Sequence, residues 1–180
     1  MRRPPGVRID SGGTGKGLAA DAVAHSLRRY SRFVVDCGGD VRIGGPAAEA
    51  EPYEVEVEHP MTRERAHLLY VGSGGIATSG MNTRLWETDA GYAHHLLDPS
   101  TGEPAWTGLV GTTALAPTAL EAETLAKAAL LSGPGGARRL LAANGGLLVL
   151  ESGEVELAGP VRARPGMRIR LPRSALGAAA

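Results

Sequence analysis

The sequence predicts an α+β domain in which two or three helices pack on a mixed, largely antiparallel sheet. Two observations lead to this prediction. Short apolar or alternating runs, separated by turn residues, are spread along the chain, and only a few helical patterns come between them. A length of 180 residues is enough for one well-cored domain, so we expect residues 1–180 to form a single domain.

The first segment is predicted to be a strand at residues 7–9, a glycine-rich turn, and a helix at about residues 15–30. One face of this helix is expected to present Lys16 and Asp21, because the apolar stripe expected to face the core consists of Leu18, Ala19, Ala22, Val23 and Leu27. Amides at a helix N-terminus, next to a lysine, favour an anion. The alternative is a plain surface lysine after a strained turn. We favour the anion site because three glycines and a threonine surround Lys16.

Two glycines interrupt the next strand pattern. Residues 33–36 form an apolar run that resumes at residues 41–43, with Gly38 and Gly39 between them. Such a pair indicates a bulge, or the close approach of a ligand or of another backbone. Asp40 then either lines that opening or forms a hydrogen bond within a structural bulge, and the sequence leaves both possibilities open.

Further strands are predicted at residues 53–58, 68–71 and 76–80, the first with its glutamates in water. Ser79 suggests a hydrolase. However, Ala77 and Met81 stand where a nucleophile elbow would have glycines. We therefore interpret Ser79 as a hydroxyl beside an open stretch of backbone.

Two adjacent histidines precede a turn near the middle of the chain. If residues 93–97 form a strand, His94 and His95 face opposite sides and cannot both serve one pocket. Asp98 and the proline after it should end the strand, and residues 100–102 supply a tight turn. One histidine is thus expected beside a loop, with the other pointing elsewhere.

The last third of the chain is predicted to hold a strand at residues 109–116 and a helix that begins after Thr118, its N-cap, with Glu121 completing a capping box. Glu123 and Lys127 fall beside the apolar stripe of this helix, one turn apart. Further expected elements are a helix at residues 136–143, a hairpin at residues 147–157 and a candidate strand at residues 167–171.

Composition excludes several classes of function. The formal net charge is zero and aromatic residues make up 4% of the chain, so neither a basic face nor a stacking platform for nucleic acid is indicated. Cys37 is the single cysteine, which excludes an internal disulfide. No segment reaches membrane-spanning length, and we expect a cytoplasmic protein without membrane insertion.

The order of the motifs resembles that of the FAD:protein FMN transferases, the ApbE-like flavin transferases. The resemblance rests on five motifs in the family's order, which are DSGGTGKG at residues 10–17 with Asp21 after it, VDCGGD at 35–40, ATSG at 77–80, HLLDPSTG at 95–102 and AETLAK at 122–127. It covers residues 7–157 and corresponds to the C-terminal part of a family member. The family's N-terminal portion, which supplies part of the flavin pocket, is not matched. The implied fold is α+β and related to the T-fold.

The resemblance implies a reaction in which a threonine or serine hydroxyl of a partner protein attacks the FMN phosphorus of FAD, and AMP leaves. His95 matches the histidine proposed to deprotonate the acceptor hydroxyl, whereas we interpret His94 as structural. The alternative for His95 is a structural histidine bonded to Asp98. The residues expected to bind the flavin nucleotide are Gly13, Lys16, Gly39, Asp40, Thr78, Ser79, Gly80, Asp98, Thr101 and Gly102.

One departure from the family pattern concerns magnesium. The family usually has an aspartate and a threonine four residues apart as magnesium ligands, where this chain has Glu123 and Lys127. A lysine ammonium has no lone pair and cannot be a ligand. Glu123 remains a possible ligand, and Lys127 either forms a surface salt bridge with it or places its ammonium where the metal would lie. In the second case we count Lys127 with His95 as catalytic.

Three functions remain open at this point. The first is FMN transfer to a flavin-acceptor protein. The second is a non-catalytic flavin-binding or docking module, which the unmatched N-terminal portion and Lys127 favour. The third is hydrolysis of FAD to FMN and AMP, with water in place of the acceptor hydroxyl.

Overall fold

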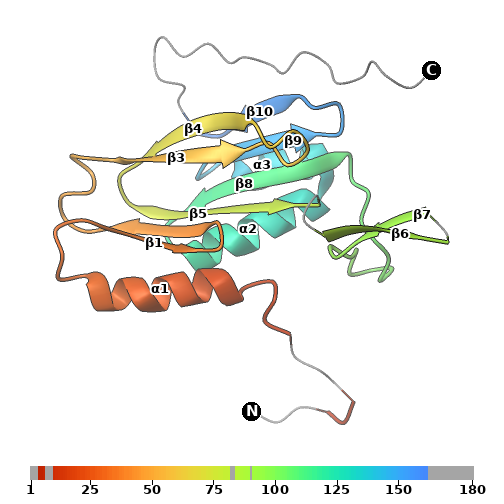
Figure 1. Ribbon diagram of the computed structural model, residues 1–180, viewed down its shortest axis with the longest axis horizontal. Coiled ribbons are helices and arrows are strands. Elements are labelled where there is room, and N and C mark those ends of the chain that lie inside the picture. Colours follow the sequence, from red (N-terminus) through yellow and green to blue (C-terminus); the bar gives the residue numbers. More distant parts are fainter. Residues whose placement is uncertain (1–3, 7–9, 82–83, 90, 162–180) are drawn as a thin grey trace.

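The computed structural model describes residues 4–6, 10–81, 84–89 and 91–161. Its largest element is a six-stranded sheet in the order β1-β2-β5-β8-β9-β10, in which every neighbouring pair is antiparallel (Figure 1). The strands are β1 (Phe33–Cys37), β2 (Asp40–Gly44), β5 (Gly74–Gly80), β8 (Leu109–Ala116), β9 (Gly146–Leu150) and β10 (Val155–Ala158). The predicted α+β class and the largely antiparallel sheet are therefore confirmed.

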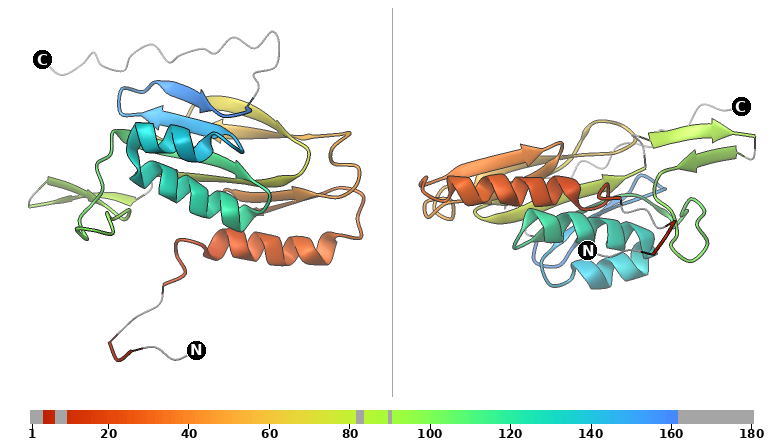
Figure 2. Two further views of the ribbon diagram at one scale, coloured as in Figure 1. Left: turned by 180° about the vertical axis from the view of Figure 1, so that it is seen from behind. Right: turned by 90° about the horizontal axis from the view of Figure 1, so that it is seen from below.

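Three helices cover one face of this sheet, and a hairpin packs on the other face (Figure 2). The helices are α1 (Gly15–Leu27), α2 (Ala119–Leu131) and α3 (Gly133–Leu141). The hairpin consists of β3 (Tyr53–Glu58) and β4 (Arg65–Val71), and a second, smaller pair consists of β6 (Leu85–Thr88) and β7 (Gly91–His94). None of the helices in the described part of the chain is long and apolar enough to cross a membrane.

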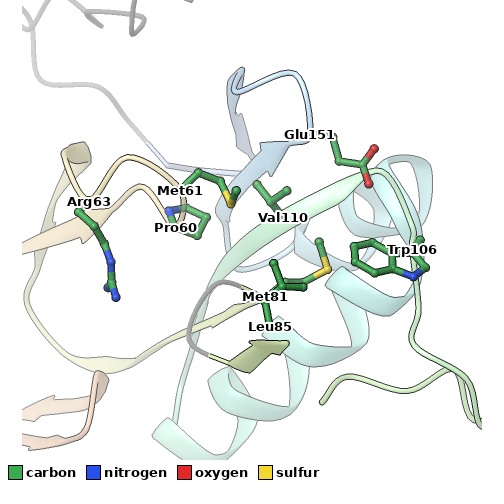
Figure 3. Close-up of a pocket in the computed structure, with 8 residues that line it drawn as sticks. All are labelled: Pro60, Met61, Arg63, Met81, Leu85, Trp106, Val110 and Glu151. Carbon is green, nitrogen blue, oxygen red and sulfur yellow. The ribbon is translucent and has the colours of Figure 1, made fainter. Parts of the chain in front are cut away.

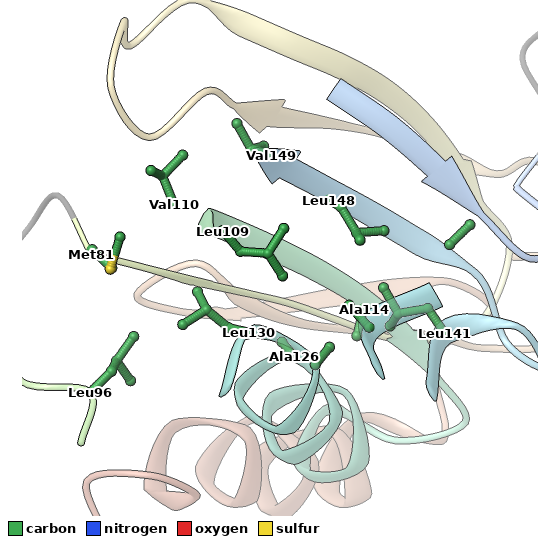
Figure 4. Packing of buried hydrophobic residues seen from close by; sticks show 13 residues of the cluster. Met81, Leu96, Leu109, Val110, Ala114, Ala126, Leu130, Leu141, Leu148 and Val149 are labelled. Atoms are coloured by element: carbon green, nitrogen blue, oxygen red, sulfur yellow. The ribbon is translucent and has the colours of Figure 1, made fainter. Parts of the chain in front are cut away.

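The core is split by the sheet into two main clusters. Leu109, Leu148 and Leu130 belong to the cluster between the sheet and the helices α2 and α3 (Figure 4). Ile43 and Leu69 belong to the cluster between the sheet and the β3–β4 hairpin. Because both faces are covered, the central strand β8 is buried at all positions but one, and its sequence is correspondingly free of charged residues.

The face of α1 that meets the protein is not the predicted one. Leu18 is 56% exposed and Val23 is 47% exposed, whereas Gly17, Ala20 and Ala24 are buried. A Cβ at Gly17 would lie 2.5 Å from the carbonyl oxygen of Ala119, so only glycine allows the two backbones to come this close. The face of α1 that packs against the protein therefore consists of small residues, and the larger apolar side chains point towards solvent. The helix also ends at Leu27, three residues earlier than predicted.

Four local predictions need comment: the structure excludes one of two alternatives, shortens one strand, and does not describe the residues of two others. Gly38 and Gly39 form a two-residue hairpin turn between β1 and β2, with φ of 65° and 90°, rather than a bulge. The strand predicted at residues 93–97 ends at His94, and beyond it Leu97 forms only an isolated bridge to Pro104. The candidate strands at residues 7–9 and 167–171 lie outside the described residues.

The helix signals in the last third were more accurate. The hydroxyl of Thr118 accepts a hydrogen bond from the Glu121 amide at 3.2 Å, as the predicted N-cap requires. Gly133, expected only to end α2, also begins α3, because the proline that follows it fits the first turn of a helix. As a result α3 starts three residues before its predicted position, while the hairpin β9–β10 is present as expected.

Candidate functional site

Two ion pairs lie between the start of α1, the β1–β2 turn and helix α2. Lys16 Nζ is 2.8 Å from Asp40 Oδ2, and Lys127 Nζ is 2.9 Å from Glu123 Oε1. Each pair joins a partly exposed lysine to a carboxylate that is only 1% exposed. Electrostatic interactions also connect the pairs, because both lysines act on both carboxylates. The structure thus brings the predicted Lys16, Asp40, Glu123 and Lys127 together.

Glu123 is held from two sides. The amide of Gly17, in the first turn of α1, donates to Oε2 at 2.8 Å, and Lys127 donates to Oε1. Burial raises the pKa of Glu123, but these two donors outweigh it and the pKa lies below its ordinary value. Glu123 is therefore a buried, ionised carboxylate. Glu123 therefore accepts from one of the amides at the N-terminus of α1 that the sequence analysis predicted to bind an anion.

Asp40 lies at the first position of β2, just after the Gly38–Gly39 turn. Burial raises the pKa of Asp40 above its ordinary value, and the nearby Lys16 opposes this only in part. Lys16 also donates to the carbonyl of Gly38 at 3.3 Å, which holds its ammonium at the mouth of the turn. Gly13 approaches the cluster from the loop before α1, since a Cβ added there would lie 3.8 Å from the Cδ and Cε atoms of Lys127.

Asp21 has a role that the sequence did not reveal. Its carboxylate accepts hydrogen bonds from the amides of Ala119 at 3.0 Å and Leu120 at 2.9 Å, and so caps α2 from another helix. Arg42 Nε lies 3.3 Å from the same carboxylate. Asp21 thereby fixes the two helices that carry Lys16 and Lys127. No local pattern could have found this, because 98 residues separate Asp21 from Ala119.

The two histidines face different surroundings, although only His94 belongs to β7. His94 is fully buried, its Nδ1 accepts from the Leu96 amide at 3.2 Å, and its ring packs edge-on against Trp106 at a centroid distance of 4.7 Å. His95 is exposed and directly follows β7. Partial burial and the positive charges of Arg84 and Lys127 lower the pKa of His95 below its ordinary value. His95 is therefore a neutral imidazole at pH 7 within the electrostatic range of Lys127.

Asp98, Thr101 and Gly102 share the loop that follows His95. The carboxylate of Asp98 accepts from the amide of Ser100 at 2.7 Å and from its hydroxyl at 2.6 Å, and these bonds lower the pKa of Asp98. The Gly102 amide donates to the Asp98 carbonyl at 2.7 Å, while the Thr101 hydroxyl accepts from Glu103. These hydrogen bonds of the Asp98 carboxylate stabilise the turn, and none of them is made with His95.

The predicted residues of β5 divide between the two faces of the strand. Ser79 is buried and pairs in register with Thr112, whose hydroxyl donates to the Ala126 carbonyl of α2. Thr78 points to the opposite face and lies 2.9 Å from the hydroxyl of Thr113. A pocket of about 290 Å³ on that face is lined by Thr78 and Gly80 of β5 together with Gly38 and Gly39. Three of the ten residues predicted to bind the nucleotide, Gly39, Thr78 and Gly80, therefore line this pocket, while Ser79 faces the other side of β5.

A larger, mainly apolar pocket of about 510 Å³ was not anticipated from the sequence. It lies beyond the end of β5 and shares Pro60 and Arg63 with the smaller pocket. Its lining comes from four separate stretches of the sequence, with the residues Pro60, Met61, Arg63, Met81, Leu85, Trp106, Val110 and Glu151 (Figure 3). Trp106 joins it to the histidine loop through its contact with His94. No periodic pattern links these residues, so only the tertiary fold reveals the pocket.

Comparison with known protein families shows to which family the chain belongs. The family model described as "ApbE family" matches residues 1–150. The chain belongs to the ApbE family. The five motifs on which the resemblance rests, at residues 10–17, 35–40, 77–80, 95–102 and 122–127, all fall within the matched range. The family resemblance found in the sequence is therefore confirmed.

Curated relatives in the ApbE family carry the name FAD:protein FMN transferase. One, from Klebsiella pneumoniae (strain 342), is 33% identical over 145 residues, which cover 78% of this chain and 41% of that relative. Another, from Salmonella typhimurium, is 35% identical over 123 residues, which cover 66% of this chain and 35% of the relative. The chain thus spans about two fifths of the length of the curated relatives it matches.

Solved structures show the same relationship. The ApbE protein of Thermotoga maritima matches with a TM-score of 0.74 and 35% identity over 86% of this chain and 52% of its own. The flavin transferase ApbE of Vibrio cholerae matches with a TM-score of 0.70 at 23% identity, again over 86% of this chain and 52% of its own, and at that identity it supports the fold alone.

Proposed function

We propose that this chain takes part in the transfer of FMN from FAD to a threonine or serine hydroxyl of an acceptor protein. The observation that carries the proposal is the cluster of the two lysine ion pairs, Lys16 with Asp40 and Lys127 with Glu123, with His95 within the electrostatic range of Lys127. The names of the ApbE relatives supply the chemistry that such a site would perform. The partners are then a flavin dinucleotide and a flavin-acceptor protein.

In this reaction the acceptor oxygen forms a bond to the FMN phosphorus, and the bond from that phosphorus to the bridging oxygen of AMP breaks. The hydroxyl proton passes to the imidazole of His95, and AMP leaves with the bridging oxygen. Phosphoryl transfer demands little from a protein beyond positioning and compensation of charge. Lys16 supports this need, because its side chain is 46% exposed and its ammonium is held at the Gly38 carbonyl beside the smaller pocket.

His95 suits the role of general base because its pKa is lowered, so the neutral form that accepts a proton dominates at pH 7. We assign nucleotide contacts to Gly13, Gly39, Thr78 and Gly80, which lie around the cluster and the smaller pocket. Ser79, Asp98, Thr101 and Gly102 belong to the same proposal through the strand and the loop that they support.

The test incubates the native chain with FAD and a protein that offers a threonine acceptor, and measures both AMP release and flavin fluorescence on the acceptor. We expect both products from the native chain, and a loss of about 10²–10⁴-fold in rate for His95→Ala. His25→Ala is the matched control, because His25 is an exposed histidine in the last turn of α1. AMP release without labelling would identify FAD hydrolysis instead, and FAD binding without either product would identify a binding module.

A further inference from the structure

Lysine is almost absent from this chain. The 19 basic residues include two lysines, Lys16 and Lys127, and both lie in the same cluster although 111 positions separate them. All other basic positions are arginine. An ammonium is a compact point charge with three donors, whereas a guanidinium is a broad planar fork. The cluster therefore uses the side chain best able to stand in for a small cation.

The donor set at Glu123 does not fit a divalent metal. One carboxylate oxygen already accepts from the Gly17 amide at 2.8 Å and the other from Lys127 at 2.9 Å. Lys127 offers no lone pair, and its charge would repel a metal ion placed beside Glu123. Within the described residues, moreover, no group of three or more histidine, cysteine, aspartate or glutamate side chains could hold an ion. At the position where the family resemblance implies a magnesium ion, Glu123 and Lys127 thus do not form a suitable ligand set.

The geometry points to Lys127 as a built-in cation, so we propose that this chain binds the pyrophosphate of FAD through Lys127 and Lys16 without a divalent metal. The inference rests on the proposed function, since that pyrophosphate is the anion invoked. Two ammonium groups match the two negative charges of a dinucleotide pyrophosphate. Lys127 remains 24% exposed and spends one donor on Glu123, so its other donors can reach a ligand.

A purely structural salt bridge explains the arrangement less well. Burying a carboxylate costs several kcal/mol before any partner compensates for it, and a surface pair such as Arg138 with Glu156 avoids that cost by staying in solvent. This chain buries both Asp40 and Glu123 to 1% exposure while leaving each partner lysine accessible. Such a design fixes each ammonium at a defined place and leaves one side of it open, as a binding site for an anion requires.

The first experiment measures FAD affinity by isothermal titration of the native chain in EDTA and in excess Mg²⁺. We expect the two dissociation constants to agree within about twofold. We expect Lys127→Met to weaken metal-free binding by about 10–100-fold, the value of one hydrogen bond to a charged group, and Lys127→Arg to restore part of the loss. Arg138→Met, which breaks an ion pair between α3 and β10, is the control and should bind like the native chain.

A second measurement keeps Lys127 unchanged and covers the case in which Lys127→Met does not fold. Selective ¹³C-lysine labelling gives side-chain signals from Lys16 and Lys127 alone, since the chain has two lysines, and the Lys16→Arg variant assigns them. FAD should shift both lysine signals in EDTA, and Mg²⁺ alone should shift neither. A shift of the Lys127 signal by Mg²⁺ alone, unperturbed lysine signals with FAD, or an increase in FAD affinity of about tenfold or more with Mg²⁺ overturns the proposal.

The transfer assay separates the two proposals. If FAD binds without metal but no acceptor is labelled, the role proposed for Lys127 stands and the proposed transferase function is wrong. If both acceptor labelling and FAD binding require Mg²⁺, the transferase function is supported. The proposal that Lys127 replaces the metal is then wrong.

Discussion

At the scale of single residues, the two buried carboxylates show how the number of donors decides a pKa. The side chains of Glu123 and Asp40 are each 1% exposed, and each carboxylate pairs with one lysine. Burial opposes ionisation in both, yet the pKa of Glu123 is lowered and that of Asp40 is raised. Two features distinguish them: the Gly17 amide gives Glu123 a second donor, and more protein surrounds the carboxylate of Asp40. Asp40 also experiences repulsion from Glu123. Glu123 is thus the fixed negative charge of the cluster.

The pH dependence of His95 can be tested directly. Because burial, Arg84 and Lys127 lower its pKa, we expect FMN transfer to fall only as the pH drops below the ordinary histidine value of about 6.5. Lys127→Met removes one of the charges that lower this pKa, so the acid limb should move to higher pH. Titration of the His95 imidazole signals by NMR gives the pKa independently of activity. An unchanged His95 pKa in Lys127→Met would contradict the coupling.

At the scale of elements, the contact between α1 and α2 positions both lysines. The sequence pattern assigned the wrong face of α1 to the core, because periodicity weights large apolar side chains and does not detect close backbone contact. Gly17 allows that contact, and its amide also reaches Glu123. The geometry of the helix pair and the ionisation of the site therefore depend on the same glycine.

Gly17→Ala tests this dependence. The added Cβ would meet the backbone of Ala119 at 2.5 Å, so α1 and α2 must separate, at a cost of about 1–3 kcal/mol in the free energy of unfolding. Urea denaturation measures the loss. The control is Ala22→Gly, because Ala22 lies on the exposed side of α1. It should cost only about 1 kcal/mol, from helix propensity. Equal FAD affinity in Gly17→Ala and the native chain would show that the helix spacing does not affect the site.

Asp21 offers a second test at this scale. Asp21→Ala removes the cap on two amides of α2 and the partner of Arg42, and should lower the free energy of unfolding by about 1–2 kcal/mol. Asp21→Asn keeps one acceptor oxygen and should lose less. Glu54→Ala, which removes an exposed carboxylate of β3, should change the stability little. The same cost for all three variants would refute the capping role.

At the scale of the whole molecule, local patterns predicted the elements better than they predicted the way the elements meet. The alternation at residues 53–58, the N-cap at Thr118 and the β9–β10 hairpin depend on neighbours in sequence, and they were predicted correctly. Asp21, the buried face of α1 and the larger pocket depend on contacts between distant segments. The site residues were reached through the motif order, since spacing alone leaves a histidine or lysine ambiguous.

The stability of the molecule as a function of pH should reveal the two opposed carboxylates. For Glu123 the folded pKa lies below its ordinary value of 4.5, so its contribution is present above that pH and is lost as the pH falls through the folded pKa. For Asp40 the folded pKa lies above 3.8, so the folded state binds the extra proton and stability falls as the pH rises through that window.

The free energy of unfolding of each variant minus that of the native chain isolates these two contributions. For Glu123→Gln the difference should become more negative as the pH rises towards 4.5 and then stay constant. For Asp40→Asn it should become more positive as the pH rises above 3.8, so this variant gains stability at neutral pH while FAD binding weakens. Urea denaturation from pH 3 to pH 8 measures both curves, and slopes of the same sign would contradict the opposite pKa shifts. If Asp40→Asn is more stable than the native chain and binds FAD more weakly, the ion pair of Asp40 with Lys16 serves the proposed anion binding rather than the stability of the fold.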